Sequence, residues 1–135
     1  MLPNHLLQDI SENPYECGMI SSVEEYCKNL SAEQIEKIFE SLNKKAMETN
    51  NFTLKSNILI VLSQLECEQI SEKTFEIVEN ALSADDFELN ELGIRCLENW
   101  EDPQLILEIL PKYHYNGWLE EYRQIVYDIT YREQI

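Results

Sequence analysis

The sequence predicts an all-α fold, and three observations support this prediction. Only three glycines and four prolines occur in 135 residues. Apolar residues recur at spacings of three and four, which is the period of an amphipathic helix, and no run alternates as a strand does. A chain of this length suits one hydrophobic core. We therefore expect a single helical domain over residues 1–135.

The N-terminal segment, residues 1–20, is the least regular part of the chain. Leu6 and Ile10 fit one face of a short helix, whereas Pro14 and Gly18 interrupt any longer element. We expect this segment to form an irregular cap on the core.

Helix-start signals follow in order after this segment. A capping residue followed three positions later by a polar or acidic side chain is typical of a helix N-terminus, and proline suits the first turn. The signals are Ser22 with Glu25, Ser31 with Gln34, Ser71, Ser83 with Asp86, and Asp102 before Pro103. The predicted helices span residues 22–30, 32–48, 53–66, 72–82, 86–99, 103–110 and 117–131.

An apolar pattern repeats when these helices are compared in pairs. The positions 4, 7, 8 and 11 residues after Ser31, Ser71 and Asp102 are apolar or aromatic in eleven of twelve cases, with Glu79 as the exception. The second helices also align, at spacings of 35 and 32 residues. Their matched positions are Phe52, Leu59 and Leu62, then Phe87, Ile94 and Leu97, then Leu119, Val126 and Ile129.

These patterns predict three helix-pair repeats, over residues 31–66, 71–100 and 102–131. Two antiparallel helices cannot bury their apolar faces alone, so such units stack on their neighbours. We expect antiparallel pairs stacked as a short solenoid. The alternative is a compact irregular helical bundle.

The segment from Asp86 to Leu97, followed by Glu101, Asp102 and Pro103, resembles a HEAT or armadillo-like repeat. It has an acidic turn, a second helix carrying Arg95, and an acidic start to the next unit. The resemblance covers residues 31–130 and implies a HEAT-like solenoid.

The chain is strongly acidic, with 26 Asp and Glu against 10 Lys and Arg and a formal net charge of −16. Nucleic acids and anionic membranes are bound mainly through Lys and Arg, so neither is expected as a direct partner. The charge has two interpretations. It promotes solubility, or it attracts a basic protein and sets the association rate.

The acidic residues concentrate in the middle of the chain. Residues 66–108 hold thirteen of them against Lys73 and Arg95, a net charge of −11. Aromatic residues overlap and follow this region, and aromatics dominate binding hot spots. Tyr115, in a loop, is expected to be the exposed tyrosine. The predicted partner-binding residues are Asp85, Asp86, Glu88, Glu91, Glu98, Trp100, Glu101, Asp102, Tyr115 and Trp118.

No catalytic, metal or cofactor site is predicted, and we expect the chain not to be an enzyme. His5 and His114 have no metal ligand at helical spacing, and each glycine stands alone, so no phosphate-binding loop is present. The cysteines are expected to be core thiols. With no export signal or membrane span, we expect a soluble cytoplasmic protein.

In size, charge and expected architecture the chain resembles bacterial immunity proteins, which neutralise toxins delivered by neighbouring cells. This resemblance implies an antitoxin whose acidic face binds a cationic toxin domain, most simply a nuclease. Two alternatives stay open: an adaptor or scaffold solenoid that binds another protein or peptide, and an accessory HEAT-like enzyme domain. The oligomeric state is not predicted.

Overall fold

The computed structural model describes residues 1–134, and all regular elements within that range are helical, which confirms the all-α prediction. None of these helices is long and apolar enough to cross a membrane. The helices are α1 (Asn4–Glu12), α2 (Ser22–Cys27), α3 (Ala32–Thr49), α4 (Phe52–Ser63), α5 (Glu72–Leu82), α6 (Phe87–Trp100), α7 (Pro103–Ile109) and α8 (Trp118–Glu133), with short 3₁₀ turns at Cys67–Gln69 and Leu110–Lys112.

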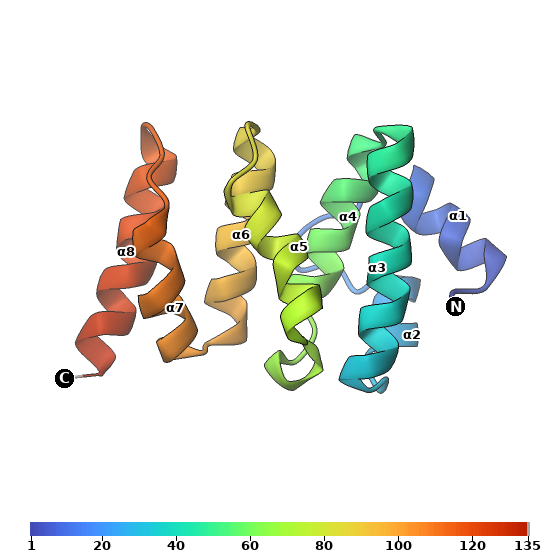
Figure 1. Cartoon of the computed structure of the whole chain (residues 1–135), viewed down its shortest axis with the longest axis horizontal. Coiled ribbons are helices and arrows are strands. Elements are labelled where there is room, and N and C mark those ends of the chain that lie inside the picture. Colours follow the sequence, from blue (N-terminus) through green and yellow to red (C-terminus); the bar gives the residue numbers. More distant parts are fainter. Residues whose placement is uncertain (135) are drawn as a thin grey trace.

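Helices α3 to α8 follow one another as three pairs along the long axis of the molecule (Figure 1). The ranges 31–66, 71–100 and 102–131 contain α3 with α4, α5 with α6, and α7 with α8. Helix α6 packs against α4, α5, α7 and α8, so it lies at the centre of the arrangement.

Local capping chemistry sets most helix starts, as the sequence indicates. Ser31 forms a complete capping box with Gln34, and the Asp102 carboxylate accepts a hydrogen bond from the Leu105 amide. Two capping residues differ from those expected. Ser21, not Ser22, caps α2, and Asp86 itself, not Ser83, caps α6. Helix α2 also ends at Cys27, three residues before its predicted end.

In the N-terminal segment, residues 4–12 form the short helix α1, and no helix follows until α2 begins at Ser22. Helix α1 buries Leu6 and Ile10 and packs against α4. Helix α4 is apolar around most of its circumference because α1, α3 and α6 all cover it.

Most of the repeated apolar positions lie in the core, including all four on α3. Phe52 and Phe87 do not: each is the first residue of its helix and is exposed. Ile129 is also exposed, against expectation. The exposed first residue of α8 is Trp118, whereas the neighbouring Leu119 is buried. The second helices of all three pairs therefore begin with an exposed aromatic side chain.

Among the cysteines, the expectation of buried core thiols fits Cys27 and Cys96. Cys67 is only partly buried, and Cys17 is exposed in the loop after α1. The sequence places Cys17 outside any helical pattern, so no apolar face was available to bury it.

Candidate functional site

An acidic stripe runs along the outer side of α6. Glu88, Glu91, Arg95 and Glu98 follow one another at spacings of three, four and three, which places them on one face of a helix. The opposite face of α6 is buried and includes Ile94 and Leu97. The stripe is therefore held on a helix that the core fixes in place.

Exposed aromatic side chains connect α6 to α8 beside this stripe. The Phe87 and Trp118 rings meet edge to face, with centroids 5.1 Å apart, and the Trp118 and Tyr122 rings are 6.4 Å apart. Phe87 and Trp118 are 46% and 49% exposed, more than an ordinary core aromatic. Ile125 and Ile129 extend the apolar surface along α8 at helical spacing.

Polar contacts fix the geometry between the two helices. The Tyr122 hydroxyl donates to the Glu98 carboxylate at 2.6 Å. The Glu91 carboxylate accepts two hydrogen bonds from the Arg95 guanidinium, at 3.0 and 2.8 Å, and the guanidinium lies 5.8 Å from the centre of the Tyr122 ring. Burial, together with the bond to Glu98, raises the pKa of Tyr122. We call the surface made by these contacts and the exposed side chains next to them the α6–α8 face: Phe87, Glu88, Glu91, Arg95, Glu98, Trp118, Tyr122, Ile125 and Ile129.

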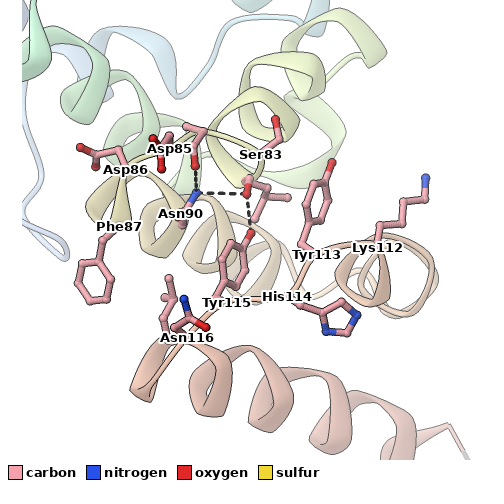
Figure 2. A pocket seen from close by; sticks show the side chains of 13 residues that line it. Ser83, Asp85, Asp86, Phe87, Asn90, Lys112, Tyr113, His114, Tyr115 and Asn116 are labelled. Carbon is pink, nitrogen blue, oxygen red and sulfur yellow. Dashed lines mark hydrogen bonds between the residues drawn. The ribbon is translucent and has the colours of Figure 1, made fainter.

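A hollow of about 580 Å³ lies between the α5–α6 turn and the loop before α8 (Figure 2). Tyr115 points into it, and its hydroxyl donates to the Leu82 carbonyl oxygen at 2.6 Å. Tyr115 is half-buried, so the expectation that it is the exposed tyrosine is wrong. The Asn90 side-chain amide donates to the carbonyl oxygens of Ala81, Leu82 and Ala84, and so ties the same turn to α6.

An ion pair holds the loop before α8 in place. The buried Arg123 guanidinium donates to both Glu120 carboxylate oxygens and to the Leu110 carbonyl oxygen. The Glu120 carboxylate also accepts a hydrogen bond from the Tyr115 amide at 2.9 Å. The Arg123 guanidinium lowers the pKa of Glu120 to about 2. This pair fixes the start of α8, and with it Trp118.

The structure brings together only part of the predicted partner-binding set. Glu88, Glu91, Glu98 and Trp118 belong to the α6–α8 face. Asp85, Asp86, Glu101 and Asp102 lie in the turns at the two ends of α6. Helix α6 has 14 residues, so these turns are about 20 Å apart at 1.5 Å per residue.

Three of the residues at the ends of α6 have local structural roles. Asp86 and Asp102 cap α6 and α7. Glu101 follows α6 with a left-handed backbone, at φ 53°. The charge of −11 over residues 66–108 is also divided, because Glu72, Glu76 and Glu79 line a different cavity from Glu88 and Glu91.

Trp100 does not belong to a partner-binding face. It is only 6% exposed, and its indole N–H donates to the Leu62 carbonyl oxygen of α4 at 2.8 Å. So little of the ring is exposed that the structure does not support its expected anchoring role. Trp100 joins α6 to the preceding helix pair instead.

Sequence reasoning missed five members of the α6–α8 face, namely Phe87, Arg95, Tyr122, Ile125 and Ile129. A signal was present: Trp118, Tyr122, Ile125 and Ile129 follow at spacings of four, three and four, in a helix whose buried face is Leu119, Arg123, Val126 and Thr130. Helix α8 therefore carries apolar side chains on a second face besides its buried one, and α7, its partner in the pair, does not cover that second face.

Within residues 1–134, no three His, Cys, Asp or Glu side chains are grouped so that they could hold a metal ion. No protein-family model matches the sequence, and neither a curated protein nor a solved structure matches it significantly.

Proposed function

We propose that this chain is an immunity protein, which neutralises a cationic toxin domain by binding it through the α6–α8 face. The observation that carries the proposal is the row of rings formed by the exposed Phe87 and Trp118 and the half-buried Tyr122. This row lies beside the carboxylates of Glu88, Glu91 and Glu98. Aromatic residues surrounded by charge are typical of tight protein interfaces.

The charge of the face favours a basic partner over other classes. A net charge of −16 repels phosphate backbones and anionic lipid surfaces. A nuclease has a cationic groove for its own substrate, and fixed carboxylates attract such a groove at long range. On this proposal, the acidic stripe speeds encounter and the aromatic row slows dissociation.

The proposed architecture is a short HEAT-like solenoid of antiparallel helix pairs. Its support is the succession of pairs along one axis and the packing of α6 against both α4 and α8. In such a stack the second helices share one surface, which is where the exposed first-position aromatics lie. A surface built on packed helices is rigid, so little ordering entropy opposes binding. We propose no catalytic role for it.

The first test is rescue from toxicity. The domain to test is the C-terminal domain of any large secreted protein that the gene directly upstream of this chain encodes. We expect co-expression with the chain to restore growth of a bacterium producing that domain, and the two proteins to form a purifiable complex. No complex and no rescue with the neighbouring domain would contradict the immunity role, and a stable complex with a housekeeping protein instead would favour the adaptor.

The second test asks whether the α6–α8 face makes the contact. Trp118→Ala should raise the dissociation rate about 30-fold if it removes a hot spot of about 2 kcal/mol. The triple variant Glu88→Lys, Glu91→Lys, Glu98→Lys should slow association and flatten its salt dependence. The matched control changes the same charge on α3, with Glu33→Lys, Glu40→Lys and Glu48→Lys. Equal effects of both triple variants would show that net charge, not this face, governs binding.

A further inference from the structure

A cavity of about 510 Å³ lies next to the α6–α8 face. Its walls are the N-terminal halves of α4 and α6 and the segment 14–17 that follows α1. Phe87, Glu88 and Glu91 line the cavity and also belong to the face, so a protein bound on the face lies next to the cavity.

Two phenyl rings line the cavity. Phe52 and Phe87 are the first residues of α4 and α6 and are 41% and 46% exposed. Exposed phenyl rings attract a cation over their faces, and an aliphatic chain packs on them equally well. Ile60 and Leu92 add apolar wall between the helices.

Two carboxylates, Glu88 and Glu91, line the same cavity. One Glu91 oxygen already accepts from Arg95, whereas Glu88 makes no ion pair or side-chain hydrogen bond with the described residues. No lysine or arginine is among the described residues that line the cavity. The Ser56 hydroxyl, on the α4 wall, is buried and has no hydrogen-bond partner within residues 1–134.

The molecule already holds one cation in this way. The Arg95 guanidinium lies between the Glu91 carboxylate, 2.8 Å away, and the Tyr122 ring, 5.8 Å away. The cavity offers the same combination of carboxylate and aromatic ring, at Glu88 with Phe52 and Phe87, without an internal cation to occupy it.

We propose that this cavity binds a lysine or arginine side chain of the partner protein. The aliphatic part of that side chain packs on Phe52, Phe87 and the apolar wall, and its charged end pairs with Glu88. A second copy of this chain is a poor source of the cation, because two chains of net charge −16 repel each other. The identity of the partner rests on the proposed function, whereas the site itself does not.

The experiment is a titration of the isotope-labelled chain with N-acetyl-lysine N-methylamide, followed by NMR. The control ligand is the norleucine counterpart, which has the same aliphatic length and no charge. We expect saturable shifts of the Phe52, Phe87 and Glu88 amides with the lysine compound, and weaker shifts with norleucine. Glu88→Gln should weaken lysine binding about fivefold, as expected for loss of one partly shielded ion pair.

The matched control variant is Glu40→Gln, which removes the same charge from an exposed position on α3. It should bind the lysine compound as the unmodified chain does. Equal binding of norleucine, equal effects of both variants, or shifts spread over the whole acidic surface would overturn the proposal. Lysine binding that persists while toxin rescue fails would refute the immunity role and leave the cationic site intact.

Discussion

Replacing Asn57 with leucine tests how the N-terminal segment is attached. Asn57 is 1% exposed on α4, and its side chain makes three hydrogen bonds to backbone atoms of the segment. The amide nitrogen donates to the carbonyl oxygens of Ile10 and Asn13, at 2.8 and 2.7 Å, and the amide oxygen accepts from the Tyr15 amide at 2.9 Å. Leucine has nearly the same size but can make none of these bonds.

The expected loss follows from these three bonds. At about 1 to 1.5 kcal/mol each, their removal lowers the free energy of unfolding by about 3 to 5 kcal/mol. That is a large share of the 5–15 kcal/mol of an ordinary domain. Burial of the leucine side chain offsets little of this loss, because its neighbours are backbone polar groups that would be left without hydrogen-bond partners.

Urea denaturation followed by circular dichroism measures the loss, and amide hydrogen exchange at Tyr15 shows whether the segment detaches first. The control is Asn99→Leu, an exposed position on α6 whose side chain makes no hydrogen bond with the described residues. A loss below about 1 kcal/mol for Asn57→Leu, or unchanged exchange at Tyr15, would refute the reasoning. Because segment 14–17 forms one wall of the cavity, the same variant should also weaken lysine binding.

Three further outcomes are expected. Glu120→Gln should destabilise the chain at neutral pH, because Arg123 stays buried without its carboxylate partner. The pKa of Glu120 in the folded chain is about 2, below its ordinary 4.5. The difference in urea midpoint between the variant and the unmodified chain should therefore shrink as pH falls from about 4.5 to about 2. Gly93→Ala should lower the unfolding free energy by about 1 to 3 kcal/mol, because its Cβ would lie 2.9 Å from a buried leucine side chain of α5; a stability gain in urea denaturation would contradict this. Cys17 should react first with a thiol reagent, whereas burial raises the pKa of Cys27 to about 12, so fast modification of Cys27 in the folded chain is not expected.

Features set by neighbouring residues could be predicted from the sequence. Ser31, Ser71 and Asp102 cap their helices as expected, because a cap involves atoms only three residues apart. The apolar period likewise predicts which face of α3 is buried. The burial of Trp100 could also have been predicted from the sequence. Gly93, Leu97 and Trp100 follow one another at spacings of four and three, which places them on the same buried face of α6.

Features set by distant residues could not be predicted in this way. The Tyr115 hydroxyl donates to the carbonyl oxygen of Leu82, which lies 33 residues earlier in the chain, and no local pattern indicates such a contact. Helix α1 has no side-chain cap, and its packing on α4 supports it. The contiguity of Phe87 with Trp118 likewise depends on how α8 lies against α6.

Helix α6 has a core face that stabilises the fold and an outer face that we propose for recognition. Ile94, Leu97 and Trp100 face the core, whereas the Glu88, Glu91 and Glu98 carboxylates lie outside it. The partly buried Glu91–Arg95 pair contributes about 1 kcal/mol, and Glu88 and Glu98 are exposed, so changing these carboxylates should leave the fold intact although the Tyr122 hydroxyl loses its acceptor. Their strong effect is expected on association with a cationic partner, where each charge acts at long range. On the proposed function, the α6 stripe can therefore change partner choice at little cost to folding, which is the property that a protein specific for one toxin among many requires.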